Sequence, residues 1–223
     1  IHHMKFGRAD SYGSVAPVPI VYSWGRSDFG NLFHKPGEDH IDGVYQFQSS
    51  RTVMSLSSNV YHSAAVTSTG ELYTCGENYD GQVAPKQGSS QDVEETKRPR
   101  ILDILGGQQR ITSVSCGLTH TVCVTASGCA ISFGGNESGQ LGHTPDAISN
   151  VPPKIVHFQA HPTSGSSAIT VSSQGGILIR KAVCGDLFTL FLTTSGELYG
   201  CGSASYLGNL LHGADSVAII GAA

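Results

Sequence analysis

The sequence predicts an all-β protein built from repeated units of about four short strands. Charged residues make up only 13% of the 223 residues, and 28 residues are glycine. This composition suits short strands and tight turns better than long helices. Three segments, 58–76, 116–134 and 184–202, align with one another without a gap. Such self-similarity is typical of one supersecondary unit that is used several times.

The aligned segments share fixed positions. In each copy a histidine or phenylalanine is followed by a glycine eight residues later and by a second glycine six residues after that. The first position holds His62, His120 and Phe188. The first glycine is Gly70, Gly128 or Gly196, and the second is Gly76, Gly134 or Gly202. A fourth, partial copy ends at Gly25, and 51, 58 and 68 residues separate Gly25 and the three later glycines. Constant spacing inside the copies and variable spacing between them indicate a rigid unit with insertions in its loops.

Each complete copy is expected to contain three recognisable strands. The first covers 111–116 and 179–184, the second 62–67, 120–125 and 188–193, and the third 71–75, 129–133 and 197–201. The centres of the second strands are apolar without alternation, which predicts strands covered on both faces. The turns 68–70, 126–128 and 194–196 end in glycine, which is expected to take a positive φ.

The repeats are expected to fill residues 20–223, with boundaries near 20–52, 53–110, 111–178 and 179–223. Residues 1–19 are expected to form an N-terminal segment, in which His2, His3 and Met4 resemble the remnant of a purification tag. The segment 217–220 is expected to start a further strand. Sheets of about four strands, each covered by its neighbours, predict blades packed around an axis.

One recurring pattern identifies a family. The pattern consists of Cys-Gly-x-x-His-Thr, then Thr-x-x-Gly, then Gly-x-Asn-x-x-Gly-Gln-Leu-Gly. It is best preserved in residues 114–142 and 62–82. This pattern resembles the repeat of the regulator of chromosome condensation family, which implies a seven-bladed β-propeller. About four copies would form half of that ring. Further repeats of the chain, a second copy or a partner would then be needed to close it.

Composition and motifs exclude several classes of function. The net charge of −4 argues against a protein that binds nucleic acid by broad phosphate neutralisation. Neither a run of about 20 apolar residues nor a secretory signal is present. A P-loop and a Gly-x-Ser-x-Gly motif are also missing. The six cysteines follow the repeat register rather than a disulfide framework. The sequence therefore predicts a non-enzymatic protein without a cofactor, located inside the cell in the cytoplasm or nucleus.

Two histidines at the same repeat position are candidate functional residues. His62 and His120 could form a metal pair or act as a general base. A structural hydrogen bond that recurs with the repeat is favoured, because residues with the period of a repeat usually serve its packing. Gly76, Gly134 and Gly202 are expected to be structural for the same reason, and no metal site is predicted.

Two functions are compatible with these observations. The first is a protein–protein interaction module or scaffold, for which variable connectors are suited. The alternative, implied by the family resemblance, is guanine-nucleotide exchange on a Ran-like small GTPase. In the exchange factor, acidic residues occupy the two positions before the repeat histidine, and here only Asp186 matches. Asp186 is therefore the candidate GTPase contact. The charged segment 94–100 is expected to be a solvated connector, with a docking loop as the alternative.

Overall fold

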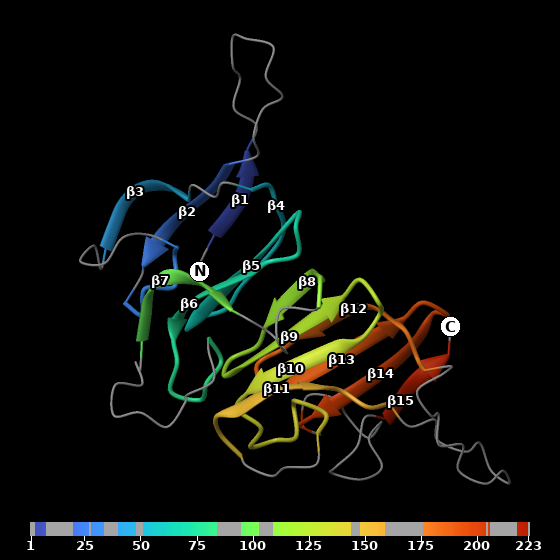
Figure 1. The fold of residues 1–223 in the computed structure, drawn as a ribbon. Helices are drawn as coiled ribbons and strands as arrows, with labels where there is room; N and C mark the ends of the chain where they lie inside the picture. Colours follow the sequence, from blue (N-terminus) through green and yellow to red (C-terminus); the bar gives the residue numbers. More distant parts are fainter. Residues whose placement is uncertain are drawn as a thin grey trace, which may run out of the picture.

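The computed structural model describes residues 3–7, 20–26, 28–33, 40–47, 51–83, 95–102, 109–143, 148–158, 176–203, 205 and 218–222. Within these residues the strands form four antiparallel sheets, which follow one another in chain order from the first, blue sheet to the fourth, red one (Figure 1). The predicted all-β class is confirmed.

The sheets are built from consecutive strands. The first contains β1 (His3–Gly7), β2 (Ile20–Arg26) and β3 (His40–Phe47). The second contains β4 (Val53–Ser58), β5 (His62–Thr67), β6 (Leu72–Glu77) and β7 (Glu95–Leu102). The third contains β8 (Ile111–Cys116), β9 (His120–Thr125), β10 (Ala130–Gly134) and β11 (Val151–Ile155). The fourth contains β12 (Ile179–Cys184), β13 (Phe188–Thr193), β14 (Glu197–Gly202) and β15 (Ala218–Ala222).

The predicted strands agree closely with these limits. The first and second strands of the repeat have the expected bounds, and the third strands differ by one or two residues at their ends. The fourth strands of the second and third sheets, β7 and β11, were not predicted. The segment 94–100 was expected to be a solvated connector, but residues 95–102 form β7, which pairs with β6.

Both ends of the chain extend the outer sheets. Residues 3–7, expected to lie in a segment before the repeats, form β1 and pair with β2. The strand expected at 217–220 exists as β15 (Ala218–Ala222), but it pairs with β14 as the fourth strand of the fourth sheet. It therefore completes this sheet and does not begin another.

The sheets pack face to face, so each one is a blade of a partial β-propeller. Separate apolar clusters join the first blade to the second, the second to the third and the third to the fourth. All six side chains of β5 and of β9 are buried, as the continuous apolar pattern predicts. In β13 the side chains alternate between buried and half-buried. The prediction of two covered faces is wrong for β13, because among the described residues no blade follows the fourth.

Glycine at the end of the third strand is required by the backbone. Gly134 has a φ of 110°, and a Cβ atom there would lie 2.6 Å from the carbonyl oxygen of Thr119. Gly76 and Gly202 have nearly the same φ and the same kind of contact with the preceding loop. An L side chain at this position would be strained and would also push the loop away.

Replacing Gly134 by alanine is therefore expected to lower the free energy of unfolding by at least about 2 kcal/mol, because a disfavoured φ and a steric clash act together. Chemical denaturation at neutral pH measures this change. Gly176→Ala is the matched control, since a Cβ there has no atom within 4 Å, and its effect should stay within about 0.5 kcal/mol. Equal stabilities for the two variants would contradict this explanation of the repeated glycine.

Candidate functional site

A chain of hydrogen bonds crosses from the second blade to the third. His62 Nε2 lies 2.8 Å from Thr121 Oγ1, and the Thr121 hydroxyl donates to the carbonyl oxygen of Gln82 at 2.7 Å. Because the hydroxyl hydrogen is used for this carbonyl, we assign the ring hydrogen to His62 Nε2, which donates to Thr121 Oγ1. His62 and Gln82 belong to the second blade and Thr121 to the third.

The same chain recurs between the third blade and the fourth. His120 Nε2 lies 3.0 Å from Thr189 Oγ1, and the Thr189 hydroxyl donates to the carbonyl oxygen of Gln140 at 2.8 Å. His120 also packs over Gly117, where a Cβ atom would come 2.0 Å from the ring carbon Cε1. A larger residue at 117 would displace the ring and break the connection between blades.

Both imidazoles are sealed from solvent. His62 and His120 are fully buried, and burial lowers the pKa of each ring to about 3. The charge of His120 lowers the pKa of His62 further, whereas the Phe188 carbonyl opposes the decrease for His120. Nδ1 of each ring has no hydrogen-bond partner within the described residues. A buried, neutral ring supports a structural role and is poorly suited to proton transfer near pH 7.

The cysteines and acids of the described residues offer no alternative centre. All six thiols are free, and burial raises the pKa of Cys75 and of Cys184 to about 12. Protonated thiols are poor nucleophiles and metal ligands. In the part of the chain that the structure describes, no group of three or more His, Cys, Asp or Glu side chains could hold a metal ion.

The loops at one end of the second, third and fourth blades form an edge that we call the loop edge. It consists of residues 59–61, 78–83, 117–119, 135–143, 148–150 and 185–187. Its most exposed large apolar side chains are Val60, Tyr79 and Ile148, with exposed fractions of 49%, 52% and 60%. Sequence reasoning did not single out Tyr79 and Ile148, because an apolar residue in a connector gives no signal of whether it is buried.

Hydrogen bonds fix the loops of this edge to one another. Asp80 accepts from the Asn150 backbone N–H at 2.9 Å and from the Ser149 hydroxyl at 2.8 Å. These contacts join the loops of the second and third blades. Between the third and fourth blades, the Leu118 N–H donates to the Asp186 carbonyl oxygen at 3.1 Å. The loop edge is therefore held in place across three blades.

Asp186 lies in the turn between β12 and β13, and its side chain is exposed. Val60 and Leu118 occupy the same turn position in the second and third blades. The described loop edge thus combines one acid with two apolar residues at the repeated position. Asp186 shares this edge with Tyr79 and Ile148, whereas His62 and His120 are buried beneath it.

Four successive antiparallel blades, of which the last three are joined by recurring imidazole–hydroxyl–carbonyl hydrogen bonds, define a repeat-type β-propeller. A family model described as the regulator of chromosome condensation (RCC1) repeat matches residues 69–124. A second model with the same description matches 55–82, 111–140 and 179–206. The chain belongs to this family, as the sequence pattern indicates.

Several curated proteins resemble the chain. It is 31% identical over 199 residues to the human E3 ubiquitin-protein ligase HERC2, covering 87% of this chain and 4% of the ligase. It is 32% identical over 193 residues to the Ultraviolet-B receptor UVR8 of Arabidopsis thaliana, covering 86% of this chain and 39% of the receptor. It is 27% identical over 201 residues to human Protein RCC2, covering 86% and 37%. The chain spans well under half of each of these relatives.

Solved structures show the same fold. Human WBSCR16 matches with a TM-score of 0.69 and 22% identity, over 89% of this chain and 46% of that chain. Yeast RCC1 (Prp20), in its complex with Kap60, matches with a TM-score of 0.61 and 20% identity, over 83% and 39%. Both support the assignment of an RCC1-type propeller.

Among the described residues, none of the helices has the length and apolar character to cross a membrane.

The buried histidines predict acid sensitivity. Their folded-state pKa of about 3 lies below the value of 6.5 expected in the unfolded chain, so the unfolded state takes up more protons. The stability that depends on the neutral rings is complete above about pH 7.5 and is lost as the pH falls through 6.5 toward 3. Protonation of each histidine in the unfolded state should lower the free energy of unfolding by about 2 kcal/mol between pH 7 and pH 5. Denaturant titrations at the two pH values measure this loss.

His120→Phe is the matched variant, because the chain itself places Phe188 at this repeat position. The phenylalanine ring should fill the space of the imidazole but cannot take up a proton on unfolding. The decrease in the free energy of unfolding between pH 7 and pH 5 should therefore be about 2 kcal/mol smaller in this variant. An unchanged pH dependence in this variant would show that His120 is not a buried neutral ring.

Proposed function

We propose that this chain is part of a non-catalytic propeller that acts as a protein–protein interaction module or scaffold, and that its partner docks on the loop edge. The observation that carries this proposal is the exposure of Val60, Tyr79 and Ile148 on hydrogen-bonded loops. Exposed apolar side chains on a fixed backbone lose little entropy when they are covered by a partner. They are typical of the centre of a protein interface.

The distribution of chemistry within the blades supports binding over catalysis. The candidate general bases and nucleophiles described above are buried in their uncharged forms. The relatives include a ligase, a receptor and RCC2, which share repeats with this chain. Six free cysteines support a place inside the cell, in the cytoplasm or nucleus. Since the matched relatives extend well beyond the aligned region, further repeats of the same chain are the proposed means of closing the ring.

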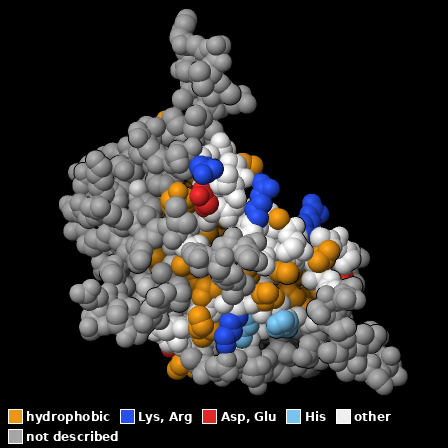
Figure 2. All heavy atoms as spheres, viewed as in Figure 1, with side chains coloured by type: hydrophobic (Ala, Val, Ile, Leu, Met, Phe, Trp, Pro, Cys, Tyr) orange, Lys and Arg blue, Asp and Glu red, His pale blue; other side chains and the backbone are white. Residues whose placement is uncertain are grey.

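The charge distribution favours a protein partner over nucleic acid. The net charge of the chain is −4. On the face of the molecule in Figure 2, the described Lys and Arg side chains stand apart from one another. Phosphate backbones are bound by clustered basic side chains.

The docking proposal predicts that Ile148→Asp lowers the recovery of bound proteins at least about tenfold, because a carboxylate would be desolvated in an apolar interface. Quantitative mass spectrometry of proteins captured by the unmodified chain and by the variant measures this loss. Leu178→Asp is the matched control: Leu178 is 49% exposed but lies outside the loop edge. Equal recovery with Ile148→Asp and Leu178→Asp, at unchanged melting temperatures, would contradict docking on the loop edge.

Guanine-nucleotide exchange on a Ran-like small GTPase is the second candidate, and the exposed side chain of Asp186 favours it. Release of labelled GDP from Ran should then be accelerated by the unmodified chain. Asp186→Ala should slow this release more than tenfold, which corresponds to about 1.4 kcal/mol in the barrier. Glu137→Ala, which removes another exposed acid of the loop edge, should leave the rate unchanged. Release that never exceeds the spontaneous rate would exclude exchange by this chain.

A further inference from the structure

The hairpin turns between the second and third strands of the repeat lie at the end of the blades opposite the loop edge. We call this end the turn edge, and it consists of residues 51–54, 68–71, 109–112, 126–129, 176–181 and 194–197. Its basic side chains are all exposed: Arg51, Arg110, Arg180 and Lys181. The loop edge, by contrast, contains acids but no lysine or arginine. The two ends of the blades therefore differ in charge.

The acids of the turn edge are Glu71 in the second blade and Glu197 in the fourth, and a hydroxyl group of the same turn binds each of them. Thr69 Oγ1 donates to Glu71 Oε2 at 3.0 Å. Ser195 Oγ donates to Glu197 Oε2, also at 3.0 Å. Glu71 Oε2 lies 3.3 Å from Arg51 Nε as well. The turn hydroxyl is thus a carboxylate-binding group in these two blades.

The third blade has the same turn without the carboxylate. Ser127 and Cys129 occupy the positions of Thr69 and Glu71. The Cys129 N–H donates to Thr125 Oγ1 at 3.0 Å, as the Glu71 N–H does in the second blade, so the backbone is unchanged. Ser127 Oγ lies 2.8 Å from Thr125 Oγ1 and 3.6 Å from Cys129 Sγ. Sulfur is a weak acceptor, so the exposed Ser127 hydroxyl lacks the strong acceptor that its counterparts have.

Two arginine-bearing strands flank this turn. The Ala126 N–H donates to the Arg110 carbonyl oxygen at 2.8 Å. On the other side, the Gly128 carbonyl oxygen accepts from the Ile179 N–H, also at 2.8 Å, and Arg180 is the next residue. The backbone on both sides of the turn therefore carries an arginine.

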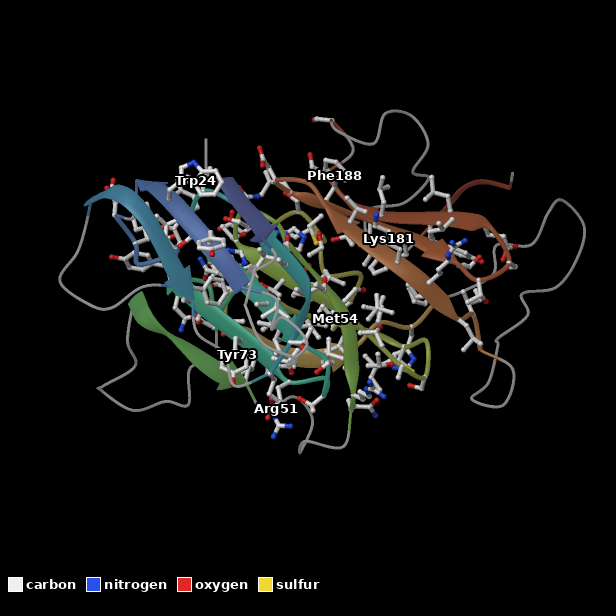
Figure 3. All side chains as sticks on the ribbon, turned by 90° about the horizontal axis from the view of Figure 1, so that it is seen from above. Trp24, Arg51, Met54, Tyr73, Lys181 and Phe188 are labelled. Atoms are coloured by element: carbon white, nitrogen blue, oxygen red, sulfur yellow. The ribbon has the colours of Figure 1, made fainter. Side chains whose placement is uncertain are left out.

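The charges around this turn are not balanced by the protein. Arg110 Nη2 donates to the Ser68 carbonyl oxygen at 2.8 Å, which fixes the guanidinium but leaves its charge uncompensated. Within the described parts of the chain, Arg110, Arg180 and Lys181 form no ion pair. In Figure 3, Arg51 lies beside the second sheet and Lys181 on the fourth, so cations stand on both neighbours of the third blade.

We propose that the turn edge at the third blade binds an acidic segment of a protein partner, with one carboxylate on the Ser127 hydroxyl. That carboxylate takes the place that the glutamate of the turn has in the second and fourth blades. Arg110, Arg180 and Lys181 attract the neighbouring acids, and guanidinium groups bind carboxylates through paired N–H donors. The observation that the chain itself places carboxylates on the equivalent hydroxyls favours carboxylate over phosphate.

The ligand is a segment with several acids, because exposed ion pairs are individually weak. The site lies at the opposite end of the blades from the loop edge and does not depend on docking there. A scaffold with both sites can hold two partners of different charge at once, one at each end of its blades.

The first experiment tests the class of ligand. Its probe is a fluorescent peptide in which glutamate alternates with alanine, so that the acids share one side of an extended chain. Anisotropy at low ionic strength, where screening is weakest, measures binding to the 223-residue chain. The same peptide with glutamine for glutamate should bind at least about tenfold more weakly, and a single-stranded oligonucleotide of equal length should also bind more weakly. Equal binding of the two peptides, or tighter binding of the oligonucleotide, would overturn the proposal.

The second experiment tests the position of the carboxylate. Cys129→Glu supplies the residue of the second and fourth blades, so its carboxylate should accept the Ser127 hydrogen bond and raise the melting temperature by about 2 °C. It should also lower the affinity for the acidic peptide at least about tenfold, because the position is filled. Cys129→Ala leaves the hydroxyl open and should keep the affinity within about twofold. Equal affinities of the two variants would show that the peptide binds elsewhere.

The third experiment separates the site from general attraction and from the loop edge. Arg180→Gln should lower the affinity for the acidic peptide about fivefold. Lys154→Gln changes the net charge equally but lies in β11, outside the turn edge, and should leave the affinity within about twofold. Ile148→Asp, which tests docking on the loop edge, should leave peptide binding intact. Equal losses in Arg180→Gln and Lys154→Gln, or loss of peptide binding in Ile148→Asp, would contradict the assigned site.

Discussion

The packing of the second and third blades, each between two others, is the constraint on which the remaining features of this structure depend. A second strand such as β9 is buried on both faces, including the polar side chains of His120, Thr121 and Thr125. Buried polar groups need hydrogen-bond partners. The hydrogen-bond partners of His120 and Thr121 include groups of the neighbouring blades. The bonds that satisfy the interior of one blade are therefore the bonds that set its position against the next.

This constraint separates the interior of the blades from the loop edge. The interior positions recur in register, because each blade must present the same groups to its neighbours. The loops are not bound by that requirement, and the distances between the repeat glycines range from 51 to 68 residues. A propeller can therefore change its exposed residues, such as Tyr79 and Ile148, without altering the packing of β5 and β9. This is why specificity of binding is assigned to the loops and stability to the strands.

The sequence predicts the strands that carry the repeat and misses those that do not. Fixed spacing located β5, β9 and β13 to the residue. The outer strand β11 was missed, because it contains Pro152 and Pro153, which usually exclude a strand; they are tolerated since β11 pairs on one side only. His62 and His120 were recognised as a recurring pair. Their partners Thr121 and Thr189 were not, because 59 and 69 residues of sequence separate them and only the register between blades brings them together.

The departures of the fourth blade from the repeat pattern lie on one of its sides. Toward the third blade it keeps the regular residues: Thr189 binds the Gln140 carbonyl oxygen, and Cys184 receives the hydrogen bond from Ser115. Away from the third blade, Val183 and Phe188 replace the serine and histidine of the earlier blades. A repeat that had merely lost its pattern would lose residues on both sides alike. Among the described residues, the fourth blade therefore keeps the hydrogen-bonding residues of its interface with the third blade and carries side chains without hydrogen-bonding groups at the serine and histidine positions of its opposite side.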